Sequence, residues 1–338
     1  MQYRILGKTG LKVSEIGFGG IPIQRTSMSE AEKVILKSLE RGINFLDTAR
    51  AYTDSEEKIG HTLAGSDIPR EELVIASKSM NRDKNGLKED VNLSLRLLRT
   101  DYLDLYQIHN VSNEKQLKAV LRPGGALEGL KEAQREGKVR FIGLTSHLPS
   151  LAVKALGIEN FDTIQFPFNI VEQEVSGTLL PLARENNIGT IVMKPLCGGA
   201  LTLKKTALQY LLSFPVSAVI PGMQSIDEVV ENTSVSGLIP DKEALDKLRQ
   251  EASELGNRFC RRCEYCLPCP EGVNISFNFL MFGYWKRYGL QEWAQKRYDS
   301  QTIKASDCIG CGECEQKCPY NLPIREMLKE CRLSLEKN

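Results

Sequence analysis

Four residues suited to proton transfer stand at or just beyond the ends of strand-like runs. Asp47 lies near the end of the apolar run 43–48, and Tyr52 follows it in the loop before a helical pattern. Lys78 and His109 end the next two strand-like runs along the chain. Asp47 and Tyr52 alone fit a helix cap and a rim aromatic equally well. The lysine and the imidazole at the next two strand ends favour one polar site built from all four.

A phenol, an ammonium, a carboxylate and an imidazole held together can deliver a proton to an oxygen. A phenol has a pKa of about 10, and a nearby positive charge favours its phenolate. Lys78 can supply that charge to Tyr52, while Asp47 holds the ammonium in place. A neutral His109 can donate a hydrogen bond to a carbonyl oxygen that gains negative charge. The set therefore suits protonation of an oxygen while a hydride reaches its carbon, and it contains neither a nucleophile nor a metal site.

Alternating strand-like and helical patterns predict the scaffold that positions these residues. After glycine-punctuated short runs in residues 1–20, which suggest a hairpin, a helical pattern covers Ser29–Arg41. Strand-like runs are expected near Ile16–Gly19 and at 43–48, 73–78, 102–109, 139–145, 163–168, 189–194 and 217–221. Helical patterns are expected between them, at 55–64, 86–99, 115–136, 149–157, 177–187, 204–213 and 226–236.

This regular alternation predicts an α/β fold with a parallel sheet. Eight units within about 250 residues match a (β/α)₈ TIM barrel preceded by an N-terminal hairpin. A doubly wound open sheet is the alternative, but the first strand is not followed by a glycine-rich dinucleotide loop. In a barrel the functional groups lie at the C-terminal ends of the strands, which is where the four polar residues stand.

Composition excludes several classes of function. The formal net charge is +1 without a long run of one sign, which gives no basis for binding nucleic acid or an anionic membrane. No apolar run approaches the roughly 18 residues of a membrane span. Residues 1–7 lack the basic and apolar segments of a signal peptide. We therefore expect a cytoplasmic protein.

The first 255 residues resemble the aldo-keto reductase family. The matching segments are Tyr3 to Gly20, Asn44 to Ala49 with Ala51-Tyr52 and Ser55-Glu56, Ala76 to Lys78, Asp101 to His109, Ile142 to His147, and Ile220 to Gly222 with Glu231-Asn232. The resemblance implies a barrel closed at its bottom by the hairpin, over residues 1–255. It also implies that Tyr52 donates the proton, that Lys78 and Asp47 tune it, and that His109 orients the carbonyl of a small-molecule substrate.

The same resemblance implies a nicotinamide cofactor, either NADP or NAD. Its carboxamide would lie by Ser146 and Gln165, and its phosphates by the loops after the seventh and eighth strands. The full set of expected cofactor-binding residues is Ser146, His147, Gln165, Met193, Lys194, Pro195, Leu196, Gly222, Gln224, Ser225, Glu231 and Asn232.

Two departures from the family pattern bear on the cofactor. Met193 stands where the family often has an aromatic residue that stacks on the nicotinamide, and Lys194 follows where a serine is common. After Gly222 the family tends to place a basic residue that grips the 2′-phosphate of NADP. Here Gln224 and Ser225 occupy that stretch, which weakens the case for NADP over NAD. Lys194 is a candidate ligand for a pyrophosphate or adenine-side oxygen.

Nine of the ten cysteines follow residue 259, and eight of them form two runs. The runs are Cys260-x-x-Cys263-x-x-Cys266-x-x-Cys269-Pro270 and Cys308-x-x-Cys311-x-x-Cys314-x-x-x-Cys318-Pro319. The second is the bacterial ferredoxin pattern, in which three thiolates bind one [4Fe–4S] cluster and the fourth binds the other. Zinc is the alternative, although structural zinc sites usually take cysteines in separated pairs.

Crossed ligation predicts two [4Fe–4S] clusters in residues 256–338. One set is Cys260, Cys263, Cys266 and Cys318, and the other is Cys308, Cys311, Cys314 and Cys269. The aromatic-rich segment between the runs is similar to the helical dicluster ferredoxins. We therefore expect a small, mainly α-helical dicluster ferredoxin-like domain that follows the barrel.

Together these features predict an oxidoreductase that reversibly reduces an aldehyde or ketone with NAD(P)H, with two clusters for electron transfer. A redox partner protein is among the expected partners. The alternative is a nicotinamide-binding electron-transfer or redox-sensing protein with little carbonyl turnover. A third interpretation makes the clusters purely structural.

Overall fold

The structure is a computed structural model that describes residues 1–256, 258–262 and 264–336. Its contacts divide the chain into two compact units. The barrel unit comprises Met1–Leu196 and Leu203–Leu245, and the cluster unit comprises Cys197–Thr202 and Asp246–Asn338. The domain boundary that the sequence suggests after residue 255 stays a prediction.

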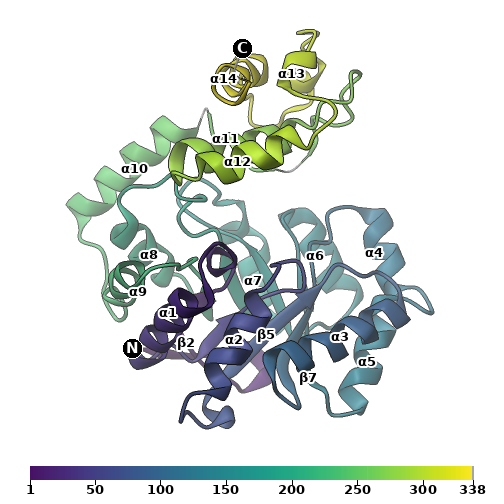
Figure 1. The fold of residues 1–338 in the computed structure, drawn as a ribbon, viewed down its shortest axis with the longest axis vertical. Helices are drawn as coiled ribbons and strands as arrows, with labels where there is room; N and C mark the ends of the chain where they lie inside the picture. Colours follow the sequence, from purple (N-terminus) through teal and green to yellow (C-terminus); the bar gives the residue numbers. More distant parts are fainter. Residues whose placement is uncertain (257, 263, 337–338) are drawn as a thin grey trace. The chain divides into compact units, whose positions relative to one another are not determined.

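The barrel unit is built on one parallel sheet wrapped by helices (Figure 1). Its strands are β3 (Phe18–Gly19), β4 (Phe45–Asp47), β5 (Val74–Ser79), β6 (Leu103–Ile108), β7 (Val139–Thr145), β8 (Thr163–Pro167), β9 (Gly189–Met193) and β10 (Ala218–Val219). They pair in sequence order, each with the next, and every pairing is parallel. The expected strand runs and the expected barrel architecture are confirmed.

The two edges of the sheet meet and close the barrel. Isolated parallel bridges join Ile16 to Val219 and Gly19 to Gly222. The Gly17 amide donates to the Val219 carbonyl at 2.9 Å. A Cβ at Gly19 would lie 2.7 Å from the Pro221 carbonyl oxygen, so only glycine lets the first and last strands approach this closely.

An N-terminal hairpin covers the bottom of the barrel. Its strands β1 (Tyr3–Ile5) and β2 (Lys12–Ser14) pair antiparallel, and fully buried Leu6 follows β1. A Cβ at Gly189, the first residue of β9, would lie 2.8 Å from the Leu6 side chain. Leu6 therefore fills the base of the barrel and leaves the opposite, C-terminal mouth for function.

The helices of the barrel unit cover the outside of the sheet (Figure 1). They are α1 (Met28–Glu40), α2 (Ser55–Ala64), α3 (Lys84–Leu98), α4 (Glu114–Leu121), α5 (Ala126–Arg135), α6 (Pro149–Ile158), α7 (Leu179–Glu185), α8 (Lys204–Leu212) and α9 (Ile226–Thr233). The expectation of one helix over 115–136 is wrong, because α4 and α5 are separate. Pro123 and the left-handed Gly124, at φ +73°, break the run.

The cluster unit is mainly helical. Helix α10 (Lys242–Gly256) leads into it, and α11 (Ile275–Arg287), α12 (Gln291–Asp299), α13 (Glu313–Lys317) and α14 (Ile324–Leu335) follow. Buried apolar residues of α11 and α14, such as Phe279 and Leu328, share one core with the thiols of Cys266, Cys314 and Cys318. Among the described residues, no helix is long and apolar enough to cross a membrane.

Candidate active site and cluster site

A buried ion pair lies at the mouth of the barrel. Lys78, near the end of β5, donates from Nζ to Asp47 Oδ2 at 2.5 Å and to the Thr48 carbonyl at 2.9 Å. Both side chains of the pair are no more than 2% exposed. Burial by itself lowers the pKa of Lys78, but the charges of Asp47 and Tyr52 outweigh it and leave that pKa raised. Lys78 is therefore a fixed positive charge at neutral pH.

The Tyr52 ring lies beside this ammonium. Lys78 Nζ is 4.9 Å from the ring centroid, and a hydrogen bond between the two side chains contributes to the raised pKa of Lys78. Turns fix the Tyr52 backbone, since its amide donates to Ala49 O at 3.0 Å and its carbonyl accepts from the Ser55 amide at 2.8 Å. The phenol is thus held near the charge that favours its ionised form.

The imidazole of His109 completes the cluster just beyond β6. Its ring packs edge-on against Tyr52, with 5.9 Å between centroids and 86° between planes. Burial, with the charges of Lys78 and Arg82, lowers the pKa of His109 from 6.5 to about 3. His109 is therefore neutral at physiological pH and can donate one ring N–H. The structure brings together all four residues predicted from the strand ends.

Arg82 was not foreseen from the sequence, yet it braces His109. Its Nη2 donates to the carbonyl oxygens of His109 at 2.7 Å and Asn110 at 2.9 Å. The Arg82 carbonyl in turn accepts from the Ala126 amide at the start of α5. Sequence patterns could not find this role, because the guanidinium acts on backbone carbonyls of a segment 27 residues away.

A pair of buried glutamines connects the ion pair to the far side of the barrel. Gln107, inside β6, donates to Gln165 Oε1 on β8 at 2.7 Å. Hydrogen bonds from Gln165 and Gln107 both act on Asp47 and oppose the rise in its pKa that burial causes. Gln165 was predicted as a cofactor ligand, whereas Gln107 was missed. The only sequence signal for Gln107 is a polar side chain at an inward position of a buried strand, β6, which also contains Asp104.

A second polar network lies on the helix-facing side of β5. Ser77 Oγ donates to Glu56 Oε1 at 2.5 Å, and Glu56 forms an ion pair with Arg50. The Arg50 amide donates to the Lys78 carbonyl at 3.0 Å. Because neighbouring strand residues point to opposite faces, this network supports Lys78 from behind without entering the mouth.

The strand ends on the other side of the mouth bring a second basic group into place. Lys194 follows β9 in a left-handed conformation, at φ +55°. Its Nζ lies 2.8 Å from Nδ1 of His147, which follows β7. Buried Asn169 donates to the Lys194 carbonyl at 3.1 Å and fixes that backbone. Lys194 and His147, both predicted as cofactor ligands, are therefore adjacent.

The remaining predicted cofactor residues have varied surroundings. Ser146 is fully buried and donates to the Val111 carbonyl at 2.8 Å. Ser225 caps α9 by accepting from the Glu228 amide at 3.2 Å, and the Gln224 amide donates to that glutamate. These residues lie at the mouth end of a strand or at α9. The same holds for the other predicted cofactor residues, which are Met193, Pro195, Leu196, Gly222, Glu231 and Asn232.

Two of these residues have structural partners that sequence could not assign. Glu231 forms an ion pair with Lys204 at 3.3 Å. A Cβ at Gly222 would lie 2.6 Å from Pro22, so this glycine permits the close approach at the barrel seam. Asn232 is 2% exposed on α9. Glu231 and Gly222 therefore each have a neighbour within the barrel unit that explains the residue type without a cofactor.

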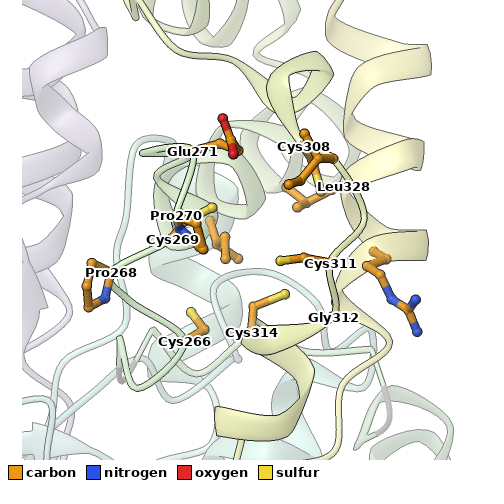
Figure 2. Close-up of a pocket in the computed structure, with 13 residues that line it drawn as sticks. Cys266, Pro268, Cys269, Pro270, Glu271, Cys308, Cys311, Gly312, Cys314 and Leu328 are labelled. Carbon is orange, nitrogen blue, oxygen red and sulfur yellow. The ribbon is translucent and has the colours of Figure 1, made fainter.

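In the cluster unit, cysteines from both runs line one pocket. Cys266 and Cys269 of the first run border it together with Cys308, Cys311 and Cys314 of the second. Figure 2 shows the sulfur atoms of Cys311 and Cys314 turned into this hollow. Apolar residues such as Ile275 complete the wall. The pocket thus contains the four cysteines of one predicted ligand set and Cys266 of the other.

The other predicted set is described only in part. Cys266 and Cys318 are buried in the core of the cluster unit, and Cys260 packs against that core. Cys263 lies outside the described residues. Cys331, predicted to have no ligand role, is fully buried, and burial raises the pKa of its thiol to about 12.

Comparison with known proteins decides the family. Residues 15–207, more than half of the chain, match the family model described as the aldo/keto reductase family. The chain belongs to the aldo-keto reductase family. Residues 259–322 match a 4Fe-4S dicluster domain, so this aldo-keto reductase carries an iron–sulfur domain after its barrel.

Known aldo-keto reductases and oxidoreductases resemble most of the barrel. L-galactose dehydrogenase of Arabidopsis thaliana is 28% identical over 73% of this chain and 93% of its own. The NADH-specific methylglyoxal reductase of Escherichia coli is 29% identical over 58% of this chain and 68% of its own. The holo structure of aldo-keto reductase AKR11C1 from Bacillus halodurans matches with a TM-score of 0.63 and 28% identity, over 75% of this chain and 96% of that one. This aldo-keto reductase is an oxidoreductase.

Proposed function

We propose that this aldo-keto reductase reversibly reduces a small aldehyde or ketone with NAD(P)H. One observation carries the proposal: a buried Lys78–Asp47 pair lies beside Tyr52, whose ring contacts a neutral His109. When bound, the dinucleotide supplies a hydride to the carbonyl carbon. Tyr52 then gives its hydroxyl proton to the oxygen, which leaves an alcohol and a phenolate that Lys78 stabilises.

His109 and Asp47 support this proton transfer in different ways. Because His109 is neutral, it can donate a hydrogen bond to the carbonyl oxygen without placing a second positive charge beside Lys78. Asp47 Oδ2 lies 2.5 Å from Lys78 Nζ and so keeps the ammonium in place beside Tyr52. In the reverse reaction the Tyr52 phenolate accepts the proton of the alcohol.

We assign the dinucleotide to the strand ends from β7 to β10. Ser146 and Gln165 suit its carboxamide, and Lys194 beside His147 provides a basic pair for an anionic oxygen. The stretch after Gly222 lacks a basic residue for a 2′-phosphate, and one relative is named as NADH-specific. These features favour NAD, and titration with both dinucleotides measures the preference.

The cluster unit would hold two [4Fe–4S] clusters, each a one-electron carrier. The pocket lined by Cys269, Cys308, Cys311 and Cys314 offers the thiol donors that one cluster needs. The dicluster match also favours a second candidate function, a nicotinamide-binding electron-transfer protein with little carbonyl turnover. Carbonyl turnover measured against cluster reduction separates the two.

Replacement of Tyr52 by phenylalanine tests the proposed proton donor. We expect kcat for aldehyde reduction to fall by roughly 100-fold or more, since general acid catalysis contributes about 10²–10⁴-fold. Dinucleotide affinity should stay unchanged, because the ring and its contact with Lys78 remain. Tyr265→Phe, at a half-exposed tyrosine of the cluster unit, is the control and should keep full activity. Substantial turnover by Tyr52→Phe would refute the assignment.

A further inference from the structure

The connection that leaves β9 is part of the cluster unit. Residues Cys197–Thr202 begin four residues after the end of β9 at Met193, yet they group with Asp246–Asn338. We propose that Tyr288, which follows α11 in the cluster unit, is a positioning residue for this loop and thereby sets the affinity of the dinucleotide. The inference rests on the proposed cofactor site, because the loop continues the segment that contains Lys194.

Close packing against glycine joins Tyr288 to the loop. Gly198 and Gly199 have φ values of +60° and +73°, in the left-handed region that favours glycine. A Cβ at Gly199 would lie 2.9 Å from Cζ of the Tyr288 ring and 3.2 Å from its hydroxyl oxygen. The phenol ring therefore occupies the space that any other residue at 199 would need.

Glu251, another residue of the cluster unit, holds the end of the same loop. The backbone amide and the hydroxyl of Thr202 both donate to Oε1 of Glu251 on α10, at 2.6 and 2.7 Å. At the other end of the loop, Cys197 is fully buried. Tyr288 and Glu251 thus fix the middle and the end of the loop.

The position of the loop gives these contacts a consequence for binding. In barrels of this kind, phosphates often bind at the loops after the seventh and eighth strands, and β9 is the seventh. Successive backbone amides in such a turn can face an anion. If Tyr288 fixes this backbone, we expect dinucleotide affinity to depend on Tyr288.

Gly199→Ala tests the inference, and Gly124→Ala is its matched control. Both glycines have φ +73°, but nothing lies within 4 Å of a Cβ at Gly124. Titration of anaerobically purified protein with NADH and with NADPH, followed by fluorescence, gives the dissociation constants. We expect Gly199→Ala to raise Kd at least tenfold and KM with it, with kcat at saturation and iron content unchanged. Gly124→Ala should stay within about twofold of the original protein.

Two variants at Tyr288 separate loop positioning from a general loss of folding. Tyr288→Ala should weaken dinucleotide binding as Gly199→Ala does, and the double variant should be no worse than either single one, because both break the same contact. Tyr288→Phe keeps the ring and should restore affinity. Equal Kd values for Gly199→Ala and Gly124→Ala would overturn the inference about Tyr288 and leave the proposed cofactor site standing. Failure of the unsubstituted protein to bind either dinucleotide would overturn the cofactor assignment and the inference with it.

Discussion

The Asp47–Lys78 pair shows what the active site demands of single residues. Removing two charges from water costs several kcal/mol per ion, and their mutual attraction often does no more than offset that cost. A well-packed apolar pair of similar size would therefore stabilise the barrel at least as well. The pair lies instead beside Tyr52, where the ammonium can stabilise a phenolate. The chemistry that the pair supports therefore explains its presence better than any contribution of the pair to the stability of the barrel.

The neutral state of His109 gives a prediction about pH. Because burial and two neighbouring cations lower its pKa to about 3, the imidazole should not titrate between pH 8 and 5. The stability that comes from burying it neutral is present above about pH 6.5 and is lost as the pH falls toward 3. NMR of ¹³C-labelled histidine, with His109→Gln to assign the signal, measures this directly. A His109 titration near pH 6.5 would contradict the account.

Arg82 provides the matching variant. Arg82→Met removes a cation beside His109, so the pKa of His109 should rise from about 3 toward 6.5. It also removes the hydrogen bonds to the His109 and Asn110 carbonyls, and kcat/KM should fall by about tenfold or more through misplacement of the imidazole. Arg135→Met, at a 75% exposed side chain, is the control. An unchanged His109 pKa together with full activity would remove Arg82 from the site.

At this scale, sequence predicts the residues that stand where strands end. Asp47, Lys78 and His109 follow from the barrel rule and the strand pattern, since each ends an apolar run. Arg82 and Gln107 do not, because one acts through backbone carbonyls and the other lies within a strand. The pairing of Lys194 with His147 was also beyond sequence reasoning, since 47 residues separate them.

Among the elements, α2 and α3 depend on one glycine for their contact. A Cβ at Gly60 in α2 would lie 2.1 Å from the Leu97 carbonyl and 2.6 Å from Leu98 Cα, at the end of α3. Because α2 follows the Tyr52 loop and Asp90 of α3 forms an ion pair with Arg50 at 3.7 Å, this contact also supports the residues behind Lys78. The two helices cannot stay this close together if a residue with a side chain replaces Gly60.

Gly60→Ala should therefore destabilise the barrel by about 2 kcal/mol or more, as overpacking in a core does. Gly157→Ala is the matched control, because Gly157 lies in α6 and nothing lies within 4 Å of a Cβ there. It should stabilise by about 0.5–1 kcal/mol through the helix preference of alanine. Thermal unfolding followed by circular dichroism measures both. A Gly60 variant as stable as the Gly157 variant would contradict the packing argument.

The order and type of the elements were predictable, but their boundaries and partners were less so. The break between α4 and α5 was readable in Pro123 and Gly124, yet helical periodicity on both sides masked it. The assignment of Cys197–Thr202 to the cluster unit was not predictable, because it depends on Tyr288 and Glu251, which lie far along the chain. Periodicity reports local structure and says nothing about such pairings.

The whole molecule joins hydride chemistry and iron–sulfur chemistry in one chain. Anaerobically purified protein should contain about eight iron and eight acid-labile sulfide atoms per chain if both cysteine runs bind [4Fe–4S] clusters. Cys308→Ser should reduce both numbers by about half, because that thiol belongs to only one of the two predicted ligand sets. Cys331→Ser, at a buried thiol outside the two runs, is the control and should keep both. Stoichiometric zinc in place of iron would overturn the cluster assignment.

Hydride transfer is the central claim, and isotope tracing tests it most directly. Anaerobic protein is mixed with NADH or NADPH that carries deuterium at C4 and with a panel of small aldehydes, and the products are analysed by mass spectrometry. The account predicts an alcohol with one deuterium on its carbinol carbon, formed by the original protein and almost absent with Tyr52→Phe. Oxidation of the dinucleotide that reduces the clusters, without any deuterium-labelled alcohol from the aldehydes, would contradict the claim of hydride transfer.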